Sequence, residues 1–413
     1  MNSYKQQRNS QKLPLIFITL CYSVGLSQTV FAANISENLS LNGFVNQGYF
    51  YSDDNPYAGL KNGSFEFREL ILNGNWQVSE KLRLSGQVMN KTVGEVIKAE
   101  SNVDFLLMDY QISHDQNSTI GVRLGRIKTP FGLYNSARDI PTTRPGVFVP
   151  QSTYFESSRD LLISSDGINL YMDLFNKIGG LHLEVFAGSR EVSDSQLKQY
   201  SGDFEGRGSY DNKGFSVNFV PDSEHDLSFN VSLLDSTSAV KGIVPYAGPP
   251  TYAVQNLNTK IDFKGVFKIA SVQYGYQDWL FTAEYLLADT VSSIDFGFPG
   301  PSPSSDIQSE GYFIQAEWFA NPKLSALLRY DTYYTNTDDR DGSESATVAV
   351  PAYRYYAKGL TVGGRWFISS GLTLTAEYSQ NSGTATLPVV PGQDLNGLDK
   401  DWSLASVELT YQF

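Results

Sequence analysis

The clearest pattern of apolar and polar positions lies in the last twelve residues of the chain, Trp402–Phe413. Alternate positions there form two sets: Val407, Leu409, Tyr411 and Phe413 are apolar, and Ser406, Glu408, Thr410 and Gln412 are polar. A period of two places successive side chains on opposite faces of a β-strand. This segment is therefore predicted to be a strand with one apolar and one polar face.

Strand-type segments recur along the chain, and we count roughly sixteen of them. The regular ones are Lys81–Lys91, Ser118–Gly125, Asp166–Leu174, Gly180–Gly188, Gly214–Val220, Asp226–Leu233, Trp279–Leu287, Gly311–Trp318, Leu324–Tyr333, Gly359–Phe367, Leu372–Gln380 and Trp402–Phe413. Four are less regular: Leu39–Tyr51, Ser64–Gln77, Asp104–Ile112 and Phe263–Tyr274. The pattern predicts an all-β protein.

The predicted connections between these strands alternate in length. Short turns are expected at Val78–Glu80, His114–Asn117, Phe175–Ile178, Pro221–His225, Gly275–Asp278, Phe319–Pro322 and Ile368–Gly371. Long polar loops are expected at Ser189–Asn212, Asp235–Asp262, Ala288–Ser309, Thr335–Tyr356 and Asn381–Lys400. Short turns at one end and long loops at the other are typical of transmembrane β-barrels, whose closure removes free strand edges. We therefore predict a closed antiparallel barrel of about 16 strands, in which the last strand pairs with the first.

The composition agrees with a barrel that has one face in lipid. The chain contains 25 Tyr, 25 Phe and 35 Gly, and its mean hydropathy is −0.26. Trp76, Phe219, Trp318 and Trp366 each come shortly before a short turn, where rings of a membrane-interface girdle are expected. Core aromatics of a soluble β-protein are the alternative interpretation of these residues.

The first 32 residues are predicted to be an export signal. Lys5, Arg8 and Lys12 precede the apolar run Leu13–Leu26, which is too short to span a membrane. Residues 33–413 then form a single domain, whose net charge changes from −13 to −16 because three basic residues are removed. That domain has no cysteine, and its acidity argues against nucleic acid as a partner.

Charged residues on the strands identify the face that must look inward. In Leu324–Tyr333, for example, Ala326 and Leu328 alternate with Arg329 and Asp331. Because an Arg or Lys facing the bilayer centre costs about 2–4 kcal/mol, the charged face is predicted to line a wet lumen. The lumen-lining candidates are Arg83, Glu284, Glu317, Arg329, Asp331, Arg365, Glu377 and Glu408.

One long connection differs from the others, since it is rich in proline, arginine and apolar residues. It runs from Gly125 to about Ser165 and is too apolar for a freely solvated loop, so we expect it to fold against the barrel wall. The predicted pore constriction consists of Arg123, Arg126, Lys128, Arg138, Arg144 and Arg159. This basic excess predicts a mild anion preference. The alternative is that the arginines pair with Asp139, Glu156 and Asp160 and pin the loop to the wall.

The layout resembles a sixteen-stranded Gram-negative porin, and Gly125-Arg126-x-Lys128-x-Pro130-x-Gly132 resembles the strand-to-loop junction of the phosphate-selective porin O/P-like family. The resemblance implies an outer-membrane channel for passive diffusion of small hydrophilic solutes or ions, with the third loop folded into the pore. It also implies contact with outer-membrane lipid and lipopolysaccharide, and assembly as a monomer or homotrimer. A last strand ending in Tyr411 and Phe413 resembles the signal read by the barrel assembly machinery. Phosphate-selective members carry a basic cluster in a later loop, where this chain has only Lys241 and Lys260.

Other functions were weighed against this one. An outer-membrane barrel that acts as an adhesin, receptor or structural anchor with a closed pore is the main alternative, and a secreted soluble β-protein is a third. An enzyme is not expected, because His114 and His225 lie in short turns and His182 lies on a strand. Asp338–Glu344 resembles a calcium loop but lacks the ligand pattern of an EF-hand, so no metal or cofactor is predicted.

Overall fold

The computed structural model describes residues 33–156, 159–192, 205–246, 255–297, 301–390, 393–395 and 397–413. The predicted export signal, residues 1–32, lies outside them. Among the described residues, no helix is long and apolar enough to cross a membrane. The strands are β1 (Ala33–Ser36), β2 (Leu39–Ser52), β3 (Ser64–Gln77), β4 (Leu82–Val93), β5 (Ile97–His114), β6 (Ser118–Lys128), β7 (Ser164–Asn176), β8 (Gly179–Val192), β9 (Glu205–Pro221), β10 (Asp226–Tyr246), β11 (Gln255–Tyr276), β12 (Trp279–Asp295), β13 (Ser304–Asn321), β14 (Leu324–Tyr334), β15 (Tyr356–Ser369), β16 (Leu372–Ser382) and β17 (Asp401–Gln412). The helices are η1 (Pro141–Thr143), α1 (Arg159–Leu162) and η2 (Ala352–Arg354).

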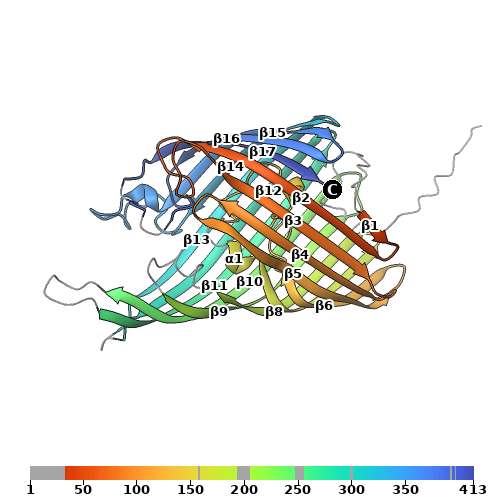
Figure 1. Cartoon of the computed structure of the whole chain (residues 1–413), viewed down its shortest axis with the longest axis horizontal. Helices are drawn as coiled ribbons and strands as arrows, with labels where there is room; N and C mark the ends of the chain where they lie inside the picture. Colours follow the sequence, from red (N-terminus) through yellow and green to blue (C-terminus); the bar gives the residue numbers. More distant parts are fainter. Residues whose placement is uncertain are drawn as a thin grey trace, which may run out of the picture.

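Sixteen of these strands, β2 to β17, close into one antiparallel barrel (Figure 1). Each pairs with the next along the chain, and β17 closes the ring by pairing with β2 from Leu404↔Ser52 to Gln412↔Phe44. The short β1 pairs with the start of β2. The predicted fold class and the predicted pairing of the last strand with the first are confirmed.

The distribution of polar and apolar side chains is the reverse of that in a soluble protein. On β14, Leu328 is 52% exposed and Tyr330 is 37% exposed, whereas Arg329 between them is 4% exposed. The same inversion appears on β16, where Thr375 and Glu377 are buried and Tyr378 is exposed. An apolar outer face with polar residues inside is the arrangement of a barrel surrounded by lipid.

Aromatic residues gather near the short turns on the outer face. Trp76, Trp279, Trp318 and Trp366 are all exposed there, and the rings of Trp279 and Trp318 stack with centroids 6.0 Å apart across β12 and β13. Their position matches an interfacial girdle.

Three of the predicted long loops are strand at both of their ends. The pairing of β10 with β11 continues to Tyr246↔Gln255, and β9 starts at Glu205 rather than after Asn212. These long hairpins reach beyond the other strands at the lower left of Figure 1. The predicted loops Ser189–Asn212, Asp235–Asp262 and Ala288–Ser309 were thus too long. Beyond the apolar belt polar residues occur on both strand faces, so the apolar–polar alternation weakens while backbone pairing continues.

Candidate channel lumen

The described residues between β6 and β7, 129–156 and 159–163, form an inner loop that lies within the barrel, as predicted. Its backbone binds inward-facing side chains of several strands. The N–H of Gly132 donates to Ser232 Oγ of β10 at 2.8 Å. The N–H of Leu133 donates to Glu284 Oε2 of β12 at 3.0 Å, and that of Val147 donates to Glu377 Oε2 of β16 at 2.9 Å. The loop therefore contacts the wall from β10 to β16.

Apolar contacts hold the same side of the inner loop. Phe131 packs in a buried cluster with wall residues Leu234, Ile269 and Leu286, and Tyr134 packs near Phe313, which is fully buried. These wall positions face inward although they are apolar, because the inner loop covers them. Burial of such large side chains contributes about 1.5–3 kcal/mol each, so the loop is a packed part of the barrel.

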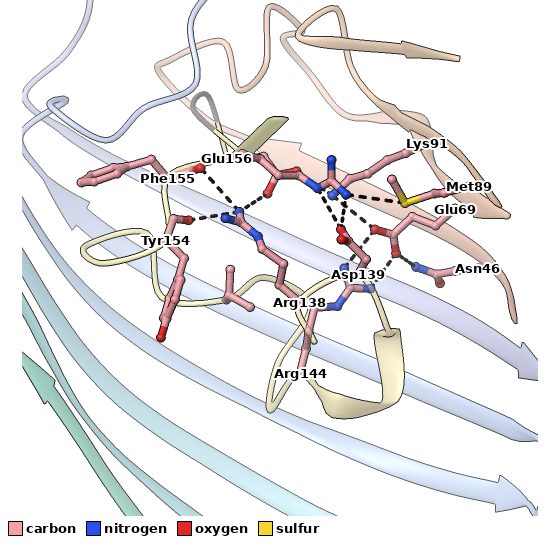
Figure 2. Close-up of polar contacts among 12 residues, drawn as sticks. Asn46, Glu69, Met89, Lys91, Arg138, Asp139, Arg144, Tyr154, Phe155 and Glu156 are labelled. Atoms are coloured by element: carbon pink, nitrogen blue, oxygen red, sulfur yellow. Dashed lines mark hydrogen bonds and ion pairs between the residues drawn. The ribbon is translucent and has the colours of Figure 1, made fainter. Parts of the chain in front are cut away.

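Ion pairs hold the opposite side of the inner loop, against β3 and β4 (Figure 2) and also against β5 and β17. Arg144 Nη2 lies 2.6 Å from Glu69 Oε2 and 3.3 Å from Glu408 Oε2. Lys91 Nζ lies 2.6 Å from Glu156 Oε1, and Arg138 binds the same carboxylate. We call this set the clamp; its members are Glu69, Lys91, Asp104, Lys128, Arg138, Asp139, Arg144, Glu156, Arg159 and Glu408.

The clamp has five basic and five acidic side chains, so its formal charge is balanced. Burial alone would raise the pKa of the Glu156 carboxyl, but Lys91, Arg138 and nearby Arg159 outweigh it and lower the pKa to about 2. Burial likewise opposes ionisation of Asp139, yet Arg159 and Lys128 hold its pKa well below the usual value. Glu156 and Asp139 are therefore ionised across the neutral pH range.

The structure distributes the predicted constriction residues over three places. Lys128, Arg138, Arg144 and Arg159 belong to the clamp, so the interpretation in which they pin the loop describes them better than a free basic patch. The side chain of Asp160, named in that alternative, lies outside the described part.

Arg126 is placed differently from the prediction. It lies opposite Leu106, which is 61% exposed, and opposite Asp166 on β7. Directly opposed residues share a face of the sheet, so Arg126 lies on the outer face. There its Nε lies 2.8 Å from Asp166 Oδ1.

The predicted lumen-lining residues all face inward, and most of them touch the inner loop. Beyond the contacts above, Arg329 donates to the carbonyl of Phe148 at 3.2 Å, and Arg365 donates to the carbonyl of Arg144 at 3.3 Å. Arg365 also pairs closely with Glu317, and Asp331 lies 4.0 Å from Arg329. These residues position the loop as much as they line a passage.

A second charged cluster lies on the wall and makes no ion pair with the inner loop among the described residues. We call it the ladder; it consists of Arg83, Asp109, Arg123, Glu184, His182 and Asp173, in order of contact. Arg83 Nη2 lies 2.6 Å from Asp109 Oδ2, and Arg123 bridges Asp109 and Glu184. Arg83 was predicted to line the lumen and Arg123 to lie at the constriction, and the structure brings the two together through Asp109.

Sequence reasoning missed Glu69, Lys91, Asp104 and Asp109 as site residues. The sequence did indicate that Glu69 faces inward. Its neighbour Leu70 belongs to the apolar, outward-facing set of β3, so alternation places Glu69 on the other face. That strand looks irregular because Phe67 and Ile71 also face inward, where they are buried.

The acidic loop Asp338–Glu344 folds around Asp339. Its carboxylate accepts hydrogen bonds from the backbone N–H groups of Glu344 and Ser345, while Arg340 pairs with Glu310. In the described residues no group of three or more His, Cys, Asp or Glu side chains could hold a metal ion.

Comparisons with known proteins identify the architecture. No protein-family model matches the chain, and a search of curated proteins finds no match. Among solved structures, OmpT of Vibrio cholerae is similar over 92% of this chain and 99% of its own, with a TM-score of 0.53 and 10% identity. One OmpT structure is described as a trimer form. OmpF of Salmonella typhi is similar over 91% of this chain and 98% of its own, with a TM-score of 0.51 and 12% identity. The outer membrane channel DcaP of Acinetobacter baumannii is similar over 91% of this chain and 97% of its own, with a TM-score of 0.51 and 10% identity. At these identities the similarity establishes a porin-like sixteen-stranded barrel.

Proposed function

We propose that this protein forms a water-filled channel in the outer membrane of a Gram-negative bacterium, through which small hydrophilic solutes or ions diffuse. The observation that carries the proposal is the inverted barrel: apolar residues cover the outside, and Ser, Thr, Asn and charged residues line the inside. Closure of sixteen strands satisfies the backbone hydrogen bonds in lipid and leaves an interior wide enough for water. The porin-like fold supports the same function.

The competing proposal is a barrel with a closed pore that serves as an adhesin, receptor or anchor. One observation favours it: the inner loop is bound on both sides of the lumen, by the clamp and by the wall from β10 to β16. The two proposals differ in whether water remains continuous past the loop.

Conductance across a planar bilayer separates them. If the channel proposal is right, the purified protein gives stable ohmic steps, and deletion of 135–151 from the inner loop enlarges them. Deletion of 338–349, an external segment, is the matched control and leaves the step size nearly unchanged. A folded, heat-modifiable protein that conducts only after the inner-loop deletion would establish the closed-pore alternative.

The remaining expectations extend this proposal. Export through residues 1–32, insertion by the barrel assembly machinery through Tyr411 and Phe413, contact with lipopolysaccharide, and the absence of enzyme activity all accompany a porin-like channel. A homotrimer is supported by the trimer form described for OmpT. Phosphate selectivity is not part of the proposal, because Arg126 faces outward and Lys128 is bound by Asp104 and Asp139.

A further inference from the structure

The ladder occupies one sector of the inner wall, between the inner loop and the short turns. Arg83, Asp109 and Arg123 lie directly opposite one another on β4, β5 and β6. Further around the wall, His182 on β8 lies opposite Asp173 on β7. His182 is the fourth residue of its strand and Arg83 the second, so the ladder lies near the short-turn mouth.

Its charges alternate in sign along a continuous chain of contacts. Asp109 accepts from Arg83 at 2.6 Å and from the hydroxyl of Tyr171 at 2.9 Å, and the Arg123 guanidinium lies 4.3 Å from the centre of the Tyr171 ring. His182 Nδ1 lies 2.6 Å from Asp173 Oδ1, and its Nε2 lies 3.5 Å from Glu184 Oε2. Only the imidazolium form can donate from both ring nitrogens. With His182 protonated, three positive groups balance three carboxylates.

The ladder is more accessible to water than the clamp. The Arg83 side chain is 41% exposed, and those of Arg123, Asp173 and His182 are 14–19% exposed. Clamp side chains are at most 5% exposed, except for Lys128 at 13%. An ion in the lumen therefore meets the ladder more directly than it meets the clamp.

The neighbouring inner wall at this height is mostly neutral. Its described inward-facing residues include Asn73, Ser85, Asn230, Thr373 and Thr410. The charged residues there are shielded: Glu284, Arg329, Glu377 and Glu408 contact the inner loop and are at most 7% exposed, and the close pair of Arg365 and Glu317 is balanced and at most 10% exposed. The ladder is thus the open concentration of charge in the short-turn half of the barrel.

We propose that the ladder is the charge-selective element of this channel, where Arg83 favours small anions and His182 makes that preference depend on pH. The inference rests on the proposed channel function. A low-dielectric wall strengthens the field of a charge in the lumen, and arginine patches select anions in pores. The charged groups facing His182 are Asp173 from β7 and Glu184 from its own strand, with Arg123 of β6 beyond Glu184; Asn218 of β9, opposite it, is neutral. Loss of the His182 proton leaves one uncompensated carboxylate, so raising the pH shifts the preference toward cations.

The test is the zero-current potential across a bilayer under a potassium chloride gradient, measured at acidic and at alkaline pH. Arg83→Gln is expected to lower the chloride-to-potassium permeability ratio by about two- to fivefold, the effect of one charge in water at close range. Asp173→Asn removes a negative charge and should shift the ratio the other way. His182→Asn should lower the ratio at acidic pH and remove most of its pH dependence.

Matched controls exist for each residue type. Arg126→Gln removes the same charge from the outer face, only three residues from Arg123, and His225→Asn changes a histidine in a short turn. Neither is expected to alter the potential.

The possible failures are distinguishable. Absence of conductance from folded wild-type protein would reject the channel itself. Normal conductance with equal effects of Arg83→Gln and Arg126→Gln, or a wild-type potential that does not change with pH, would overturn the role of the ladder. If His182→Asn does not fold, Arg83→Gln still decides, because the Arg83 side chain is 41% exposed and its loss leaves no buried cavity.

Discussion

Two arginines only eighteen residues apart show how burial decides what an ion pair does. Arg144 is 4% exposed and pairs with Glu69 and Glu408, whereas Arg126 pairs with Asp166 on the outer face. Removing Arg144 leaves Glu408 buried without its cation and leaves Glu69 with only Lys91, at 3.4 Å, which costs about 3–5 kcal/mol. An exposed pair such as that of Arg126 contributes about 0–1 kcal/mol.

We therefore predict that Arg144→Met loosens the inner loop and Arg126→Met does not. A cysteine at Ser152, a fully buried loop position, reports the opening. In the Arg144→Met background its labelling by a small thiol reagent should accelerate at least about a hundredfold, because every 1.4 kcal/mol is tenfold. Similar labelling rates in the two methionine backgrounds would show that the clamp does not hold the loop.

The same two arginines show which features of single residues can be predicted from the sequence. Arg126 follows Leu124 by two positions, and Leu124 is exposed on the outer face, so alternation alone would have placed Arg126 outside. The motif around Gly125 suggested the opposite. The partners of Arg144 were beyond sequence reasoning, because Glu69 and Glu408 are 339 residues apart and meet only when β17 closes against β2.

The inner loop is the element whose behaviour should depend most on acid. The pKa of Glu156 is lowered to about 2 and that of Asp139 lies well below its usual value, so both carboxylates stabilise the bound loop while they are ionised. A depressed pKa gives stability that is fully present above the unfolded value, about 4, and is lost as the pH falls through the folded value.

The loop is accordingly expected to stay bound at about pH 4 and to open as the pH approaches about 2. Hydrogen exchange of peptides within 133–156, corrected for the intrinsic effect of pH, measures this opening. Lys91→Met removes a principal cation from Glu156 and should move the opening toward pH 4. Opening of the wild-type loop already at pH 4 would contradict the clamp as its acid-resistant anchor.

At the scale of elements, the sequence predicted that the inner loop folds into the barrel, but not which wall residues it contacts. Phe131, Tyr134 and Phe148 were too apolar for solvent and indicated a buried loop, and the structure buries all three. Their wall partners Leu234, Ile269 and Phe313 lie on inward faces, where a wet lumen predicts polar residues. Such positions can be recognised only once the loop that covers them is known.

At the scale of the whole molecule, the alternation of apolar and polar side chains predicted all sixteen barrel strands, because lipid imposes one apolar face on every strand, and the pattern of short turns and long loops predicted the closure. Side-chain alternation did not predict the strand ends that extend beyond the lipid. The outer parts of β9, β10 and β11 pair regularly, yet polar residues occupy both faces, so the sequence resembles a loop. The extent of the hairpins is fixed by backbone pairing, which leaves no period in the side chains.

The final prediction concerns Phe413, which extends the pairing of β17 with β2. The N–H of Phe413 donates to the carbonyl of Gly43 at 3.0 Å, and the N–H of Gly43 donates to the carbonyl of Phe413 at 2.9 Å. A Cβ on Gly43 would lie 2.6 Å from both Phe413 Cζ and the carbonyl oxygen of Ile71. The ring of Phe413 thus packs directly over Gly43 and stacks on Tyr411 with centroids 6.2 Å apart.

Gly43→Ala should therefore destabilise the closed barrel by about 1–3 kcal/mol, as overpacking does. Gly74→Ala is the matched control in the next strand, because its Cβ would meet only the flexible end of Leu41 at 3.2 Å. Heat-modifiable gel migration measures the folded fraction after refolding in detergent and after assembly in cells. Gly43→Ala should lower it in both settings. Deletion of Phe413 should also lower it in both if the residue closes the barrel, but only in cells if the residue is solely a recognition signal. Equal behaviour of the two alanine variants would exclude the packing of Phe413 on Gly43 as the contact that closes the ring.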